Sequence, residues 1–414
     1  MSSVPEVGSV PDAVAPPPRH PRFPLVDGMR AIAVLSVVFV HAAVTGQAVG
    51  PSFAGRLLAH LNIGVTIFFL ISGFLLYRPF IAHRAGGAAP PKVREYAKRR
   101  LLRIYPAYWL VVTVLVVVPG LTGVVDGQWW IQYGLMQTLP VQGGSGCTGA
   151  GWGCGLAQTW SLVVEMTFYV ALPLYVLCAA RLARGRSMQS WMRAELLLLA
   201  VLAAISVALD ANGVDPGVRS WVSGTLVGYV LWFALGMGLA VVSVGLEGRE
   251  SQSQIHRLIV ARPLVPWLAA FALYAFVSAR LPPTPYITDR GQVVMAHVCF
   301  GAIAALLLLP AVFGDRGGGA PRRILANSIV AWLGLISYGI FLWHYVAAVK
   351  LGLGGAEAGF GLVLLGTLAI SIPCAAASYY LVERPVLRLK YRRLRDLLNA
   401  RGRRLDTSPE SEGA

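Results

Sequence analysis

Long apolar runs follow one another along nearly the whole chain. Each is near the length that a helix needs to cross a hydrocarbon core of about 30 Å. Ten can be counted, at approximately 31–49, 61–81, 104–119, 160–180, 195–210, 221–244, 263–280, 292–313, 328–349 and 359–382. The pattern predicts an all-α, polytopic integral membrane protein with about ten transmembrane helices in one bundle.

The two ends of the chain lack this pattern. Residues 1–24 are rich in Pro, Ser, Val and Ala without apolar periodicity, which is typical of a disordered tail. Arg30 and the apolar stretch 31–43 resemble a signal peptide, but the Pro-rich tail before them and nine further apolar runs argue against cleavage. We expect a membrane domain at 25–386 and a basic cytoplasmic tail at 387–414.

Composition excludes an ordinary soluble protein. Apolar residues make up 56% of the chain and charged residues only 13%, whereas about a quarter of the residues in soluble domains are charged. The net charge of +16 would suit nucleic acid, but the basic residues form no stripe with aromatics and cluster between the apolar runs. We therefore expect membrane lipid, and no nucleic acid, as a partner.

Basic residues segregate between alternate connections. Ten crossings put both termini on one side, which carries most of the basic residues: Arg84, Lys92, Arg94, Lys98, Arg99, Arg100, Arg103, Arg181, Arg184, Arg186, Arg193, Arg322, Arg323 and the tail from Arg384 to Arg404. The other side has only Arg56, Arg219, Arg280, Arg290 and Lys350. The positive-inside rule then places both termini in the cytoplasm, with the helices in the inner (plasma) membrane.

This topology puts the connection at 120–159 outside, where disulfides persist. Cys147 and Cys154 lie close together there in a Gly-rich segment. We expect them to be bonded, and two free thiols are the alternative. The other three cysteines lie singly in apolar runs, so we expect no metal site built on cysteine.

Ionisable residues inside apolar runs are functional candidates, because inserting one costs a few kcal/mol. Four positions stand out: His41, Glu165, His297 and His344. Eleven residues separate His41 from Arg30, so on a helix the imidazole lies roughly 16 Å above the guanidinium, near the membrane midplane. An anion-binding group and a buried base would share one helix. The alternatives are an ordinary positive-inside arginine and a core histidine.

Six segments resemble, in the same order, the membrane-bound acyltransferase family 3. They are Asp27–Val34 continuing to His41, Phe68–Leu75, Arg100–Trp109, Trp160–Glu165, Ser337–His344 and Tyr380–Pro385. The resemblance covers roughly residues 22–390.

This resemblance implies transfer of an acyl group from cytoplasmic acyl-coenzyme A to a hydroxyl. The acceptor would be a glycan, a lipid-linked sugar or a secondary metabolite such as a macrolide, and acetyl is the default acyl group. No permanently bound cofactor and no metal are expected. Many members that modify surface polysaccharide carry an added SGNH-hydrolase-like domain. Because the chain ends soon after the tenth run, we expect a small or membrane-associated acceptor, and polysaccharide is the alternative.

A coenzyme A donor and acyl transfer to a hydroxyl imply roles for several residues. Arg30, Arg100 and Arg103 would bind the phosphates of coenzyme A, since guanidinium groups suit phosphate geometry. His41 would act as a general base or would itself take the acyl group, and both routes stay open.

Further residues would serve the acceptor side. Glu165 would orient the imidazole or bind the acceptor, and Ser72, Trp160 and Ser161 would line its path. His344 would contact the acceptor or be an interfacial side chain. We assign His297 to structure. For Glu383 and Arg384 a local ion pair at a helix end, followed by the helix-stopping Pro385, is a sufficient explanation.

A transporter or flippase without covalent chemistry is the rival class. Such proteins often consist of two related halves. No repeat relates residues 31–210 to residues 221–382, which favours the enzyme. A non-catalytic relative acting as a sensor differs from the enzyme only in activity.

Overall fold

The computed structural model describes residues 23–86, 91–117, 129–136, 156–211, 225–247, 253–313, 318–353 and 358–388. Within these ranges the chain forms helices and no strand, which confirms the predicted all-α class. Cys147, Cys154 and most of both predicted tails lie outside the described residues.

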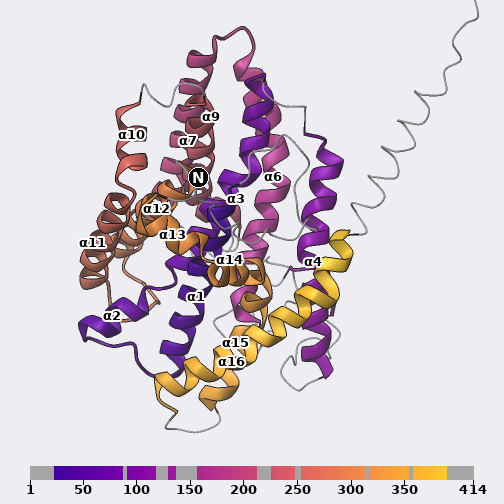
Figure 1. The fold of residues 1–414 in the computed structure, drawn as a ribbon, viewed down its shortest axis with the longest axis vertical. Coiled ribbons are helices and arrows are strands. Elements are labelled where there is room, and N and C mark those ends of the chain that lie inside the picture. The colour runs from indigo at the N-terminus through magenta and orange to yellow at the C-terminus, as the bar shows by residue number, and fades with distance from the viewer. Residues whose placement is uncertain are drawn as a thin grey trace, which may run out of the picture.

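The helices follow one another along the described chain and vary widely in length (Figure 1). They are α1 (Pro24–Thr45), α2 (Phe53–Ala59), α3 (Ile63–Arg84), α4 (Val93–Val117), α5 (Trp129–Tyr133), η4 (Ala157–Thr159), α6 (Trp160–Ala183), α7 (Met188–Ala211), η5 (Leu226–Tyr229), α9 (Val230–Gly245), α10 (Gln254–Ala261), α11 (Leu264–Arg280), α12 (Arg290–Val312), α13 (Gly319–Ala326), α14 (Ser328–Leu335), α15 (Ser337–Leu353), α16 (Phe360–Ser378) and η7 (Tyr379–Glu383). In Figure 1, α4 lies at one flank of the bundle and α10 and α11 lie at the other.

Eight helical segments in the described chain are long and apolar enough to cross a membrane. Two other predicted runs differ from simple spans. The run at 328–349 consists of α14 and α15, which meet at an angle of 72° and would make a ninth span if counted as one. The run at 263–280 is α11, which has only 17 residues. A polytopic membrane protein is therefore confirmed, but ten crossings are not.

Glycines bring the backbones of α3 and α9 into contact. A Cβ on Gly73 would lie 2.3 Å from the Phe233 carbonyl oxygen, and one on Gly236 would lie 2.0 Å from the Leu70 carbonyl oxygen. Both distances are too short for a carbon atom. This close packing joins the second and sixth predicted spans of the same chain.

The start of α1 is fixed in the same way against α13 and α14. A Cβ on Gly28 would lie 2.4 Å from the Leu325 carbonyl oxygen, and one on Gly334 would lie 1.8 Å from that of Asp27. Small residues at such contacts let helices approach closely where no hydrophobic effect drives them together. The Asp27-Gly28 pair therefore anchors α1 just before Arg30.

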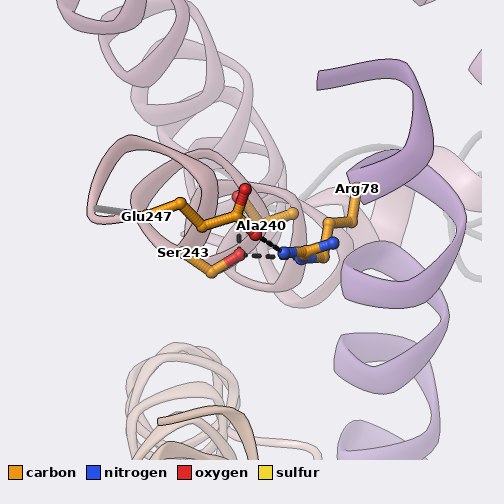
Figure 2. Close-up of polar contacts among 4 residues, drawn as sticks. All are labelled: Arg78, Ala240, Ser243 and Glu247. Atoms are coloured by element: carbon orange, nitrogen blue, oxygen red, sulfur yellow. Dashed lines mark hydrogen bonds and ion pairs between the residues drawn. The ribbon is translucent and has the colours of Figure 1, made fainter. Parts of the chain in front are cut away.

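A buried arginine links α3 to the end of α9. Figure 2 shows the Arg78 guanidinium pointing at Ser243 and Glu247. Its Nε donates to the Ser243 hydroxyl at 3.2 Å, it forms an ion pair with Glu247, and it lies 4.9 Å from the centroid of the Phe23 ring. The charge is thereby satisfied inside the protein, which lowers the cost of burying it.

Two further buried charges are held by similar networks. The Glu195 carboxylate accepts hydrogen bonds from Tyr77 and, at 2.7 Å, from Tyr175, and it pairs with Arg84 at 3.5 Å. Arg322, 1% exposed, donates to the backbone carbonyls of residues 259, 260, 310, 313 and 318. These contacts join neighbouring helices and explain both residues structurally.

The helix contact at Gly236 can be tested with a matched control. Gly236→Ala should lower the melting temperature of the purified protein in detergent, because overpacking of this kind costs about 1–3 kcal/mol. Gly238→Ala, two residues further along α9, should leave the melting temperature unchanged or raise it slightly. The added Cβ would meet only Leu196 at 3.6 Å, and alanine favours helices more than glycine does. Equal melting temperatures for the two variants would contradict the packing argument.

Candidate functional site

A cavity of about 160 Å³ lies among α1, α3, α4, α6 and α15. Its wall combines apolar side chains with an unusual number of polar ones for the interior of a membrane bundle. The polar lining residues are Arg30, Ser72, Arg100, Arg103, Ser161, Glu165, Tyr169, Ser337 and Tyr338. Six of the nine residues predicted to bind or react, namely Arg30, Ser72, Arg100, Arg103, Ser161 and Glu165, are in this group.

Three guanidinium groups converge on the cavity. Arg30 comes from α1 and is held by Asp27, whose Oδ1 lies 2.6 Å from its Nη1. Arg100 and Arg103 come from α4, which begins at Val93, so they lie on a helix and not in a connection as the apolar run suggested. Arg100 lies 5.7 Å from the centroid of the Tyr169 ring.

The positive charges in this group are not fully neutralised by carboxylates. In the part of the chain that the structure describes, Asp27 pairs with Arg30, whereas neither Arg100 nor Arg103 has a carboxylate oxygen within 4.0 Å. Arg100 and Arg103 also repel the charge of Arg30. Like charges held together in a poorly solvated space favour binding of an anion.

Glu165 faces the same cavity from α6. Its Oε1 accepts hydrogen bonds from the Ser72 hydroxyl at 2.5 Å and from the Tyr169 hydroxyl at 2.7 Å. Tyr169 lies one turn after Glu165 on the same helix, whereas Ser72 comes from α3. These hydrogen bonds fix the carboxylate at the cavity wall and do not involve His41.

His41 contacts His344 across α1 and α15. The Nδ1 atom of His41 lies 3.0 Å from Nε2 of His344, and the rings of His41 and Tyr345 are perpendicular with centroids 5.1 Å apart. His344 is fully buried, which excludes the interfacial alternative. Because α1 ends at Thr45, His41 lies one turn from that end of the helix, and its place near the membrane midplane stays a prediction.

The two histidines lie beyond the cavity wall at Phe341. Phe341 lines the cavity, and its ring centroid is 5.9 Å from that of His344, one turn further along α15. Gln158 holds this turn by donating to the carbonyls of Phe341 and Leu342 at 3.4 and 3.1 Å. The cavity therefore approaches the histidine pair, although neither histidine lines it.

Two other candidates lie away from the cavity. Trp160 packs on Phe69 and Tyr229, with ring centroids 6.3 and 5.2 Å apart, and is not part of the cavity wall. His297 pairs with Asp210 at 2.5 Å. This contact is compatible with the structural role expected of His297.

The segment Tyr379–Glu383 forms a π-helix at the end of α16. Glu383 is buried, its Oε1 has no hydrogen-bond partner, and the segment packs against α4. The explanation by a local Glu383–Arg384 pair and a helix stop is wrong. No ion pair joins these two described residues, and the helix continues through Pro385 to Arg388, because the π-turn has already interrupted the regular hydrogen-bond ladder.

The sequence reasoning missed Tyr169, Ser337 and Tyr338 as parts of the site. Tyr169 is four residues after Glu165, which places both on one helix face. Ser337 and Tyr338 begin α15 directly after the bend, and the Tyr338 hydroxyl donates to the Ile104 carbonyl at 2.9 Å. Helical spacing could have revealed the first residue, and the family-like segment Ser337–His344 could have pointed to the other two, although only the bend shows why they reach the cavity. In the described ranges no cluster of three or more His, Cys, Asp or Glu could hold a metal ion.

Comparison with known proteins gives a consistent family. Residues 23–382 match a family model described as an acyltransferase domain. A candidate peptidoglycan O-acetyltransferase, YrhL, of Bacillus subtilis is 25% identical over 385 residues, which cover 89% of this chain and 55% of that protein. The chain thus spans about half of YrhL.

Two relatives match over most of their length. The exopolysaccharide production protein ExoZ of Rhizobium meliloti is 28% identical over 337 residues, which cover 78% of this chain and 89% of ExoZ. The acyltransferase MdmB of Streptomyces mycarofaciens is 25% identical over 411 residues, which cover 91% of this chain and 95% of MdmB. No solved structure gives a significant match.

Proposed function

This chain belongs to the acyltransferase family whose domain model it matches, and we propose that it transfers an acyl group from acyl-coenzyme A to a hydroxyl of a glycan, a lipid-linked sugar or a small metabolite. The observation that carries the proposal is the convergence of Arg30, Arg100, Arg103 and Glu165 on one cavity. Family membership supports acyl transfer as the reaction, and the three arginines favour an acyl donor that is an anion.

The arginines suit the phosphates of coenzyme A. Guanidinium groups bind phosphate oxygens through paired hydrogen bonds, and Arg100 and Arg103 are not engaged by a carboxylate within the described chain. The cavity is smaller than the roughly 300–1,000 Å³ of pockets that enclose whole ligands. We therefore assign to it only the part of the donor that contacts the arginines and the arm leading away from them.

The charge distribution supports a direction for the donor. Basic residues gather on the side of the predicted topology that holds both termini, which favours cytoplasmic termini in the plasma membrane. Arg30 lies near the beginning of α1 and His41 near its end. Coenzyme A would then bind from the cytoplasm, and its thioester would extend toward His41.

In the simplest mechanism His41 acts as a general base. The acceptor hydroxyl loses its proton to the imidazole while its oxygen attacks the thioester carbonyl. The new C–O bond forms, the C–S bond breaks, and the imidazolium returns the proton to the departing thiolate. If His41 instead takes the acyl group first, an acyl-imidazole precedes the ester. Both routes release one coenzyme A thiol per ester formed.

The acceptor would carry a hydroxyl group at or beyond the membrane. The names of the relatives connect the family with O-acetylation of peptidoglycan and with exopolysaccharide production. Glu165, Ser72 and Ser161 face the cavity with hydrogen-bonding groups that suit a hydroxyl. A transporter would need no acyl donor. Release of coenzyme A that depends on the acceptor would therefore distinguish an acyltransferase from a transporter.

His41→Ala should reduce acyl transfer to a small residual rate because the base or nucleophile is lost. Membranes containing the variant are incubated with radiolabelled acetyl-coenzyme A and an extract of the native host, and base-labile label is counted. His83→Ala, which removes an exposed histidine on α3, is the control and should keep full activity. Near-normal transfer by well-inserted His41→Ala would refute the assignment.

Arg103→Gln should raise the KM for acyl-coenzyme A about tenfold or more, since a charge-assisted hydrogen bond contributes about 1.5–3 kcal/mol. Arg94→Gln provides a control on the same helix, because Arg94 is exposed and does not line the cavity. Steady-state rates of thiol release at varied donor concentration measure both constants. Similar KM values for the two variants would show that the cavity does not bind the donor phosphates.

A further inference from the structure

We propose that His344 is a positioning residue that fixes the tautomer of His41, so that Nε2 of His41 is the atom that accepts the proton or the acyl group. The inference deepens the proposed function and rests on the role of His41 in it. It replaces contact with the acceptor, the role expected of His344 from the sequence, with contact to the reacting histidine.

The tautomer follows from a chain of hydrogen bonds that has one direction. Nδ1 of His344 lies 3.1 Å from the Ile340 carbonyl oxygen. A carbonyl only accepts, so this nitrogen carries a proton. In a neutral imidazole the other nitrogen is then an acceptor, and Nε2 of His344 must receive a hydrogen bond.

That hydrogen bond comes from His41. Its Nδ1 lies 3.0 Å from Nε2 of His344, so Nδ1 of His41 carries the proton and its Nε2 keeps a free lone pair. The ring is left with one defined basic atom. The second nitrogen of a catalytic or metal-binding histidine is commonly fixed in this way by a hydrogen-bond partner.

The surroundings hold His344 in place. It is fully buried, and Gln158 donates to the carbonyls of Phe341 and Leu342 in the same turn of α15. A Cβ on Gly339 would lie 2.8 Å from Cα of Ala375, so α15 also packs tightly on α16. A ring flip would place a carbon against the Ile340 carbonyl and lose the hydrogen bond there.

A histidine in this position differs from the usual carboxylate partner. In the described chain the hydrogen bonds of Glu165 go to Ser72 and Tyr169, and no carboxylate bonds to either imidazole. A neutral partner orients the base without placing a second charge in the bundle. When Nε2 of His41 is protonated, its Nδ1–H still donates to His344 and disperses the new charge toward the Ile340 carbonyl.

A double-mutant cycle tests this role. His344→Leu removes the acceptor and should lower kcat on the order of 100-fold, with the KM for acetyl-coenzyme A unchanged, because the wrong tautomer of His41 becomes accessible. His344→Gln can present its side-chain oxygen to Nδ1–H and should restore kcat to within about tenfold of the unmutated protein. His41→Ala with His344→Leu should be no slower than His41→Ala alone.

Other kinetic outcomes would overturn the role. Equal losses in the Leu and Gln variants, a raised KM in place of a lowered kcat, or a further loss on adding His344→Leu to His41→Ala would each show that His344 acts on something other than His41. Melting temperatures measured in detergent accompany each variant.

A spectroscopic measurement tests the tautomer without activity. In the full-length protein labelled with ¹⁵N-histidine, the His41 signals are identified by their absence in His41→Ala. They should show a protonated Nδ1 and an unprotonated Nε2, and this pattern should be lost in His344→Leu. Protonated Nε2 in the unmutated protein would overturn the proposal. If the unmutated protein shows the expected pattern but transfers no acyl group, the hydrogen-bond chain is confirmed and the proposed function is refuted.

Discussion

The site depends on how closely the first turn of α1 can approach α13 and α14. At Gly28 and Gly334 backbone touches backbone, and any side chain larger than hydrogen would separate the helices. Arg30 follows one turn after Asp27 on α1, and His41 lies three turns further along. A single helix thus carries both Arg30 and the histidine proposed to react, and its fixed start sets the position of both.

The distribution of charge inside the bundle separates structure from function. Arg78, Glu195 and Arg322 are buried with partners that satisfy them, and each joins two or more helices. Around the cavity the balance is different, because Arg100 and Arg103 have no carboxylate at ion-pair distance within the described chain. A protein keeps such an excess in a poorly solvated space only if something else supplies the counter-charge. The phosphates of the proposed donor are suited to that role.

Much of the architecture could be predicted from apolar runs and short motifs. The runs located every long helix, and the motifs pointed to the family that the comparison shows. The motifs also carried Arg30, Ser72 and Glu165, which do meet at one cavity. These successes reflect local information, since a long apolar stretch favours helical structure on its own account.

The failures involve contacts between distant parts of the chain. His41 and His344 are 303 positions apart, and their contact depends on the rotation of α15 after the bend, which no local pattern encodes. Glu195 escaped notice because averaging over an apolar run hides one carboxylate. The short α11 and the bent pair α14–α15 show that hydropathy detects apolar length without showing whether a helix runs straight.

The 72° bend between α14 and α15 lies beside the cavity, so the shape of the cavity depends on the shape of the backbone there. Non-helical backbone is tolerated at membrane depth only inside protein or beside water, and Ser337, the first residue after the bend, borders the cavity. A straight helix would place no such break beside the cavity. A substitution that straightened this helix would displace Ser337, Tyr338 and Phe341 from the cavity wall, so the angle of the break helps to set how large the cavity is.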